Sequence, residues 1–348
     1  MRPLGIALSL SATITLVACD DGVSGGNGDA SPTVVLYTSA DDVFAEHIVE
    51  AFETETGIDV QLVGDTEATK TTGLVTRLLA EQEAPRCDVW WSSEPMGTLL
   101  LEAAGVLAEG GMAGLVDDAW PNELVGAGQT WLGFAERGRV IAYADDRVET
   151  PPTTLDALTQ PEWSGRVGMA RPQFGTTRGH MALLHARWGG DLFEAWLVAM
   201  ESNGLRIYDG NARVVRAIYE GEIDIGLTDT DDVWVAVANG WPIGMTFETA
   251  NPNARFPSLG PTTIPNTVAM VAGGPNPGPA RELAAYLVSP AVERLLAESD
   301  SRNIPVHPAL RAEFADLLPA SDGRPDYSDA AASVPDAMTA CEDVLISP

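Results

Sequence analysis

The stretch that decides the fold, residues 33–63, reads TVVLYTSADDVFAEHIVEAFETETGIDVQLV. It opens with an apolar run typical of a short buried strand. Phe44, Ile48 and Phe52 then recur at every fourth position, which predicts one apolar face of a helix that ends at Gly57. A second apolar, β-branched run closes the stretch and indicates another strand. Strand, helix and strand in this order predict a parallel sheet.

The same alternation continues on both sides of a central segment. Downstream of the opening stretch we expect a helix around 74–79, a strand at 88–92 and a helix from Pro95 to Gly105. The alternation then restarts, and the region after Pro279 is expected to be mostly helical. The elements of the second run are predicted as strands at 166–170, 205–208 and 223–227, and helices at 176–188, 191–202, 211–220 and 231–239.

Two crossings between these runs are expected. Residues 138–143 form a strand that can pass from one domain to the other, and a second crossing is expected within 244–271. The fold class is therefore predicted as α/β, with two doubly wound α/β domains joined by hinge strands and an interdomain cleft. Ligands of open α/β sheets bind outside the carboxyl ends of the strands. The expected boundaries are 33–137 and 261–310 for domain one, 138–260 for domain two, and 311–348 for a C-terminal helical segment.

The N-terminus has the pattern of a targeting segment. Arg2 precedes a short apolar run, and residues 16–19 read LVAC, which resembles the lipobox of bacterial lipoproteins. Residues 1–18 are thus predicted as a lipoprotein signal peptide with Cys19 as the lipidated residue. An ordinary signal peptide followed by a chance cysteine is the alternative. The Gly-, Ser- and Asp-rich residues 19–32 are expected to be a flexible tether.

These features predict a periplasmic protein that is held at a membrane through its lipid alone. Asp20 at the second mature position resembles the retention signal of inner-membrane lipoproteins. The chain has 50 acidic and 20 basic residues and a formal net charge of -30. So acidic a chain repels nucleic acid and anionic headgroups, which excludes nucleic acid as a partner.

Two cysteines remain once Cys19 is assigned to the lipid. Cys87 and Cys341 are expected to pair as a disulfide in an oxidising compartment, or else to be two buried thiols.

Carboxylates follow several of the predicted strands. Asp41, Glu94, Asp229, Asp231 and Asp232 all stand just after a strand end, where they should face the cleft. Clustered carboxylates repel one another unless a cation or proton neutralises them. Oxygen ligands suit hard cations such as ferric, calcium or manganese ions, and an ammonium-bearing organic ligand fits equally well. The alternative for Asp41, Asp231 and Asp232 is that they cap helices.

Two predicted helix starts carry groups that favour an anion. Residues 175–178 and 211–213 supply Thr176, Thr177, Arg178, Asn211 and Arg213. Ordinary capping is the alternative for each helix. A site with an anionic and a cationic half fits a metal bound with its anion, and it also fits a zwitterion such as an aminophosphonate.

The aromatic residues Trp90, Trp91 and Trp234 are expected either to line this cleft or to pack in the core.

Several segments together resemble bacterial ferric-iron ABC-transporter substrate-binding proteins, over residues 33–310. This resemblance implies the type II periplasmic-binding-protein fold. It also implies that Thr176, Thr177 and Asn211 match the positions that hold the family's synergistic anion. The segments are Val35–Tyr37, Phe52–Ile58, Asp88–Ser92, Glu222–Asp224, Ile264–Val268 and Ala284–Pro290.

The chain departs from the family's pattern at the metal ligands. Asp41 stands where the iron-binding members have a histidine, and Ser93 aligns with their glutamate, with Glu94 one residue later. Their pair of adjacent tyrosines is replaced by residues 228–232, which read TDTDD. Ligation of iron by phenolates is therefore not supported.

The predicted function is the lipid-anchored substrate-binding component of an ABC importer, acting as a monomer with a permease in the inner membrane. Its ligand is expected to be ferric iron or another hard cation with a synergistic anion. The alternative ligand is a phosphorylated or amine-bearing organic solute. A carboxylate-metal hydrolase fits less well, because nucleophile-elbow, P-loop and dinucleotide-binding motifs are absent from the sequence. A sensory or purely structural lipoprotein is a further, less favoured alternative. No catalytic residue or catalytic cofactor is expected.

Overall fold

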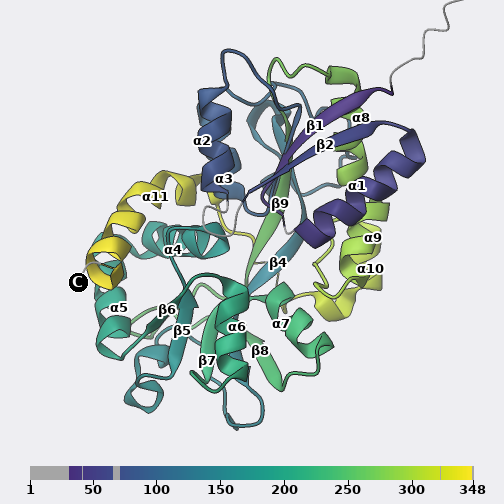
Figure 1. The fold of residues 1–348 in the computed structure, drawn as a ribbon. Helices are drawn as coiled ribbons and strands as arrows, with labels where there is room; N and C mark the ends of the chain where they lie inside the picture. The colour runs from purple at the N-terminus through teal and green to yellow at the C-terminus, as the bar shows by residue number, and fades with distance from the viewer. Residues whose placement is uncertain (1–30, 41, 66–70, 322, 347–348) are drawn as a thin grey trace, which may run out of the picture. The chain divides into compact units, whose positions relative to one another are not determined.

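The computed structural model describes residues 31–40, 42–65, 71–321 and 323–346 (Figure 1). Strands and helices alternate along most of this chain, as the sequence predicts. The strands are β1 (Thr33–Thr38), β2 (Asp59–Gly64), β3 (Val89–Ser92), β4 (Trp131–Ala144), β5 (Val167–Ala170), β6 (Arg206–Tyr208), β7 (Ile225–Asp229), β8 (Ile243–Phe247) and β9 (Thr262–Met270). The helices are α1 (Asp42–Thr56), α2 (Thr72–Ala80), α3 (Pro95–Ala103), α4 (Gly175–Trp188), α5 (Gly190–Ser202), α6 (Asn211–Tyr219), α7 (Thr230–Ala238), α8 (Pro277–Leu287), α9 (Pro290–Glu298), α10 (Pro308–Glu313) and α11 (Tyr327–Cys341).

The described strands form one mixed sheet in the order β2-β1-β3-β9-β4-β7-β5-β6, with β8 paired to β4. β1 is parallel to β2 and to β3, and β5 is parallel to β6 and to β7. These two parallel groups correspond to the two α/β runs predicted from the sequence. The prediction of an α/β fold with two doubly wound units is confirmed. The residue boundaries given for the two domains stay a prediction.

The long strand β4 joins the two parallel groups (Figure 1). Its first part pairs with β9, and its last part pairs with β7 and β8, in each case antiparallel. The sequence predicts a crossing strand only over 138–143, so β4 begins seven residues earlier than expected. The four residues from Trp131 to Phe134 belong to the strand because they pair with Ala269 to Asn266 of β9.

The pairing of β4 with β9 is interrupted by a bulge between Phe134 and Arg137. Ala135 takes a φ of 41° there, in the left-handed region that few non-glycine residues adopt. The backbone of Glu136 leaves the ladder and forms a bridge to Ile304 instead. A bulge redirects the side chains that follow it, and in β4 those side chains include Arg137 and Arg139.

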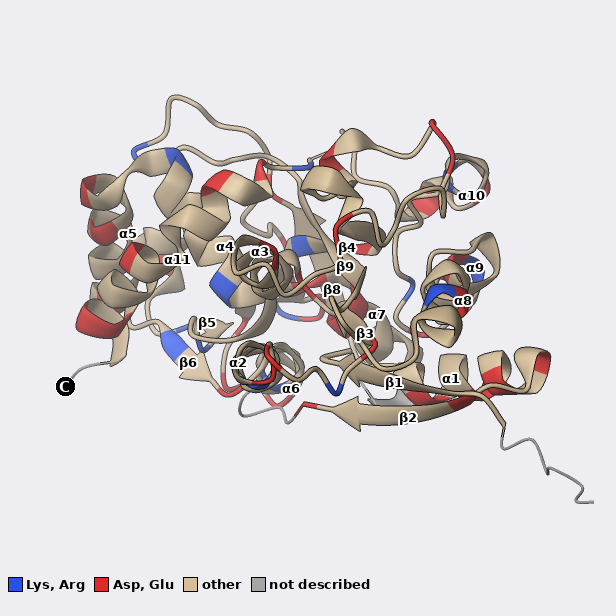
Figure 2. Cartoon of the chain, turned by 90° about the horizontal axis from the view of Figure 1, so that it is seen from above, with Lys and Arg blue, Asp and Glu red and all other residues tan. Residues whose placement is uncertain are grey.

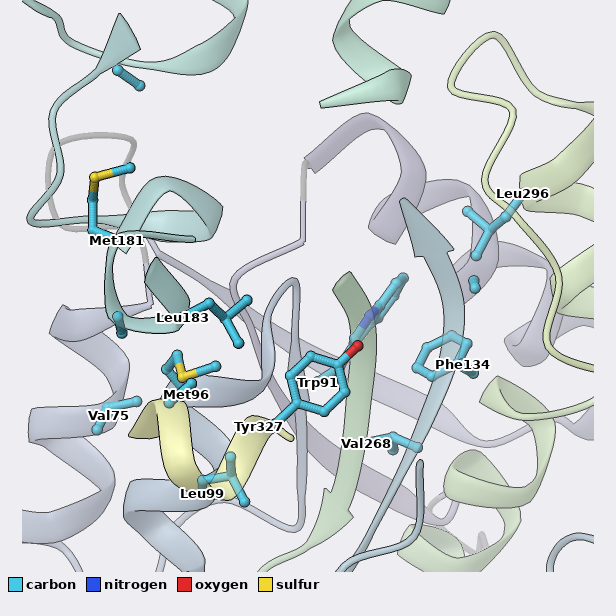
Figure 3. Packing of buried hydrophobic residues seen from close by; sticks show 14 of the residues in the cluster. Val75, Trp91, Met96, Leu99, Phe134, Met181, Leu183, Val268, Leu296 and Tyr327 are labelled. Carbon is cyan, nitrogen blue, oxygen red and sulfur yellow. The ribbon is translucent and has the colours of Figure 1, made fainter. Parts of the chain in front are cut away.

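The core is packed mainly by aliphatic and aromatic side chains from both sides of the sheet (Figure 3). The rings of Trp91 and Phe134 lie 6.0 Å apart between centroids, and Val268 is buried beside them. Trp90 is fully buried and donates from Nε1 to Thr98, whereas Trp91 donates to Asn266. Of the two alternatives expected for Trp90 and Trp91, core packing is thus the one that the structure shows.

Trp234 does not line the cavity either. It lies on α7 and packs against a small separate cluster, with the guanidinium of Arg302 4.4 Å from its ring centre.

The C-terminal segment is helical, as expected, and it is tied to the middle of the chain. Helix α11 packs on α4, with further contacts to α3 and α5. Arg324, which precedes α11, donates two hydrogen bonds to the buried carboxylate of Glu136 in the β4 bulge, at 2.9 and 2.7 Å. Of the helices in the described part of the chain, none combines the length and apolar character that crossing a membrane requires.

Acidic positions predominate on the outer helices, α1 and α5 among them, and basic positions are sparse (Figure 2). This distribution follows from the excess of acidic residues. The arginines buried inside the molecule therefore say more about a binding site than the surface charges do.

The disulfide expected between Cys87 and Cys341 is not formed, and both residues are buried free thiols. Cys87 precedes β3, and its Sγ lies 3.1 Å from the carbonyl oxygen of Val89. Cys341 ends α11, the helix that packs on α4 and α5. Burial raises the pKa of both thiols, to about 12 for Cys341, so both stay protonated at neutral pH.

We expect the Cys19→Ala protein, purified without reductant, to show no thiol reaction with Ellman's reagent while folded. It should release two thiol equivalents in denaturant, because Cys87 and Cys341 are both free. A release of none after unfolding would show that the two residues are bridged.

Candidate functional site

A cavity of about 480 Å³ lies at the carboxyl ends of parallel strands from both halves of the sheet. Most of its wall comes from segments at or after the ends of such strands, which is the place where α/β sheets bind ligands, and Arg137 adds a side chain from the middle of β4. Apart from Phe174, the wall is made of polar or small residues. The lining residues are Ser39, Ala40, Asp65, Ser93, Arg137, Ala170, Arg171, Phe174, Gly175, Thr176, Thr177, Asp209, Gly210, Asn211, Ala212, Asp229, Asp231 and Asp232.

Three carboxylates of this wall form a cluster at the junction of β7 and α7. Asp229 is the last residue of β7, and Asp231 and Asp232 lie in the first turn of α7. One carboxylate oxygen from each residue lies within 4.8 Å of the others. Oxygen atoms at this spacing can converge on a single hard cation.

Asp229 is held by a buried hydrogen-bond network. Its Oδ1 accepts a charged hydrogen bond from Arg139 NH1 at 2.7 Å, and the two residues face each other across the β4–β7 pairing. Its Oδ2 accepts from the hydroxyl of Thr176 and, at 2.8 Å, from the Nδ2 group of Asn211. Arg139 and Asp229 are only 3% and 1% exposed. The Asp229 carboxylate is thus well satisfied, which a buried ion pair requires, whereas Nε and NH2 of Arg139 have no hydrogen-bond partner among the described residues.

The other two carboxylates also have polar partners. Asp231 Oδ2 lies 3.0 Å from Arg137 NH1, and Asp232 Oδ2 accepts from the Thr228 hydroxyl at 3.1 Å.

The opposite wall is built from hydroxyl groups after β1 and β3. The Ser39 and Ser93 hydroxyl oxygens lie 3.3 Å apart, and the backbone N–H of Ser93 donates to Ser39 Oγ at 3.0 Å. Thr71 donates to the same Ser39 oxygen at 3.2 Å.

Two helix starts also face the cavity. The N-cap residues of α4 and α6 are Phe174 and Gly210, and neither helix has a side-chain cap. The first-turn N–H groups of such helices carry a partial positive charge that favours an anion. Thr177 uses its hydroxyl to donate to Asn211 Oδ1 at 3.2 Å.

One nearby histidine does not add to this charge. Burial and the nearby Arg139 keep the pKa of His180 well below its ordinary value, so this side chain stays neutral.

The structure places the predicted Ser93, Asp229, Asp231, Asp232, Thr176, Thr177 and Asn211 on one cavity wall or another. Whether they contact a ligand stays a prediction. Asp41 and Cys19 lie outside the described residues.

Glu94, Arg178 and Arg213 are not among the residues that line this cavity, and whether they contact a ligand also stays a prediction. The Glu94 carboxylate caps α3 and accepts from the N–H groups of Met96 and Gly97 at 2.5 and 3.0 Å. Burial raises the pKa of Glu94, and the charge of Arg178 opposes that rise.

Arg213 is directed away from the predicted site. It lies on the exposed side of α6, where it pairs with Glu222 at 2.6 Å and with Glu220 at 3.2 Å.

Several charged residues in the wall, and Arg139 behind it, were not predicted from the sequence. Arg137 and Arg139 are two positions apart, so they share one face of β4, and this spacing inside an apolar run was the available signal. Asp65, Arg171 and Asp209 each follow a strand by one residue, the same criterion that pointed to the other carboxylates.

A polar cavity at the carboxyl ends of parallel strands, with clustered charges of both signs, defines a ligand-binding protein of the α/β class. The model of the bacterial extracellular solute-binding protein family matches residues 33–299, and the chain belongs to this family. The family expected from the sequence is thereby confirmed.

The chain is similar to the Fe(3+)-binding periplasmic protein of Serratia marcescens, with 29% identity over 203 residues. That match spans 57% of this chain and 57% of the Serratia protein.

Two solved structures share the fold. The ferric binding protein from Campylobacter jejuni superposes with a TM-score of 0.79 at 17% identity, covering 90% of this chain and 99% of that one. The periplasmic binding protein AfuA from Actinobacillus pleuropneumoniae, solved with fructose-6-phosphate bound, has a TM-score of 0.72 at 16% identity, covering 91% and 100%. The type II periplasmic-binding-protein fold is confirmed.

Replacing Asp229 by alanine should destabilise the protein by about 3–5 kcal/mol, because it leaves the buried Arg139 guanidinium without its partner. The free energy of unfolding in urea measures this. The matched control is Asp209→Ala, which breaks a solvent-exposed pair with Arg171 and should cost less than about 1 kcal/mol. Equal costs for the two variants would contradict a structural role for the Arg139–Asp229 pair.

Proposed function

We propose that this protein is the ligand-binding component of an ABC importer and that its cavity takes a hard cation, ferric iron first, together with an anion. The observation that carries the proposal is the cluster of Asp229, Asp231 and Asp232, whose oxygens lie within 4.8 Å of one another. The name of the Serratia relative supports ferric iron as the cation. The ligands here are carboxylates, since no tyrosine or histidine is among the described residues that line the cavity.

The anion is expected beside the carboxylates, at two helix starts that border the same cavity. The starts of α4 and α6 lack side-chain caps, so their first-turn N–H groups are free to bind oxygen atoms of an anion. The side chains of Thr176 and Asn211 hold Asp229, so we assign the anion contact to the backbone more than to them.

We place this ligand in a cleft between domain one and domain two. Binding there would favour the closed arrangement of the domains, which is the working motion of hinged ligand-binding proteins. The permease in the membrane is the expected partner, and the protein is expected to act as a monomer and not as an enzyme.

A phosphorylated organic solute is the second candidate. A cavity of about 480 Å³ is larger than one ion needs and falls in the range of small-molecule sites. The same fold in AfuA was solved with fructose-6-phosphate bound. An amine-bearing phosphonate would use the carboxylates and the helix starts together.

Asp231→Asn/Asp232→Asn should weaken ferric binding by at least about tenfold, because it removes two charged oxygen ligands while nearly keeping their shape. Titration with ferric nitrilotriacetate in phosphate buffer measures the affinity, and the melting temperature checks the fold. Asp209→Asn is the matched control, since it removes a carboxylate of the same cavity that lies outside the cluster.

Unchanged affinity in the double variant would remove the carboxylates from the proposed site. A wild-type protein that ignores ferric iron but whose melting temperature rises with a sugar phosphate or an aminophosphonate would select the second candidate.

We also propose that the protein is exported to the periplasm and anchored in the inner membrane through lipidated Cys19. Cys19→Ala should leave an unprocessed or soluble product, because the lipid attaches to that thiol. Membrane fractionation with metabolic fatty-acid labelling tests this. Unlabelled wild-type protein free in the medium would count against the anchor.

A further inference from the structure

A second cavity, of about 1020 Å³, lies among four helices, and the proposed function leaves most of its wall unused. Residues of α1 and α9 line one part of it and residues of α6 and α7 another, and Figure 1 shows these two pairs of helices beside different parts of the sheet. It adjoins the first cavity, because Ala212, Asp231 and Asp232 line both. Its volume is that of a site for a small organic molecule, and it is far larger than a metal ion needs.

The wall of this second cavity is about half apolar, unlike that of the first. Eight of its seventeen lining residues are apolar, and among these Phe44, Val235, Trp241 and Leu295 are only partly buried. Their side chains are therefore accessible to a ligand. The ring of Trp241 stacks on that of Tyr219, with 4.4 Å between the centroids and 7° between the planes, which fixes the indole in place. An apolar group that covers such a surface releases water and stabilises the complex.

The charges around this surface are mainly negative. Arg294 lines the cavity, but its guanidinium already binds the Glu313 carboxylate through two hydrogen bonds, one of them 2.7 Å long. With His47 counted as protonated, the acidic residues among the described lining still outnumber the basic ones by four to two. The four acidic residues are Asp231, Asp232, Glu298 and Asp300. This wall therefore repels an anionic ligand and attracts a cationic one.

We propose that this second cavity binds a small organic cation with an apolar body, such as an arylalkylammonium ion. The apolar body would cover Val235 and Leu295, which belong to different helices, α7 and α9. The cationic group would lie near Glu298 and Asp300, and the face of an aromatic ring such as that of Trp241 attracts it further. The site is distinct from the one proposed for ferric iron, and so is the class of its ligand.

The apolar and the charged parts of this wall have different tasks. Glu298 and Asp300 are exposed, and water screens the attraction of exposed charges. Most of the affinity is therefore expected from the apolar body of the ligand, whereas the carboxylates decide which sign of charge is accepted. A fatty acid or an anionic phospholipid offers a similar apolar body, but its head group has the sign of charge that this wall disfavours.

The test is isothermal titration of the purified protein with four probes, in a buffer without ferric ion, so its outcome does not depend on the proposed function. The probes 4-phenylbutylammonium, 4-phenylbutanol and 4-phenylbutyrate share one apolar body and carry a positive, a neutral and a negative group. Tetramethylammonium carries the positive charge without that body. The phenylbutylammonium probe should bind as one molecule per chain, and the butyrate and tetramethylammonium probes should each bind at least about tenfold more weakly.

Two variants test the two parts of the wall, at residues that line the second cavity and not the first. Glu298→Gln/Asp300→Asn removes both exposed carboxylates. It should weaken binding of the phenylbutylammonium probe by about three- to tenfold and leave that of 4-phenylbutanol within about twofold of the wild type. Leu295→Gln replaces an apolar contact by a polar one of similar size, so it should weaken both probes by about fivefold or more.

The matched controls are Asp145→Asn/Glu149→Gln and Leu100→Gln, which make the same changes at exposed residues outside both cavities and should keep the wild-type affinities. Equal losses in the controls would overturn the inference, as would equal affinities for the ammonium and butyrate probes. So would unchanged binding in both cavity variants, because the probe would then lie elsewhere, or no saturable binding up to about 10 mM. If the melting temperature shows that Leu295→Gln does not fold, Val235→Gln makes the same test from α7.

Discussion

The pairing of β4 with strands from both halves of the sheet is the constraint on which the site depends. β4 hydrogen-bonds to β9 from Trp131 to Arg139 and to β7 from Arg139 to Tyr143. Arg139 is thus placed opposite Asp229. Arg137, two residues earlier in β4, lies on the same face of the strand and borders the cavity. The bulge before Arg137, with its left-handed Ala135, sets that direction. The charges of the site are consequently positioned by backbone geometry and by buried anchors.

The electrostatics of the cavity combine a buried ion pair with a second pair at the cavity wall. Three carboxylates would repel one another, yet two of them already have a guanidinium within 3.0 Å. In the buried pair of Arg139 with Asp229, the carboxylate also accepts hydrogen bonds from Thr176 and Asn211. The pair of Arg137 with Asp231 borders the cavity.

Much of the fold follows from local patterns in the sequence. The apolar runs of β1 and β7 and the four-residue spacing of α1 predict their elements, because burial of one face imposes the period. The carboxylates after β7 are predictable for the same reason, since residues after a parallel strand emerge at the ligand-binding edge. The early start of β4 is not predictable, because it depends on pairing with β9, about 130 residues away along the chain.

The errors in the candidate site have similar causes. A glutamate before Pro95 can cap α3 or face the cavity, and only the positions of Met96 and Gly97 decide between these. Nothing in the sequence around Cys87 or Cys341 indicates that the two thiols stay unpaired in the folded chain. The position of Arg137 at the cavity could not be predicted from the sequence. It depends on the bulge in β4 and on the contact with Asn266, and both form only in the folded chain.

The most direct measurement is a crystal structure of the protein grown with ferric ion and phosphate, with anomalous data collected on both sides of the iron absorption edge. We predict one iron peak within about 2–2.5 Å of carboxylate oxygens of Asp231 and Asp232. Phosphate density should then contact the first turns of α4 and α6. An iron peak away from these carboxylates would contradict the proposed function.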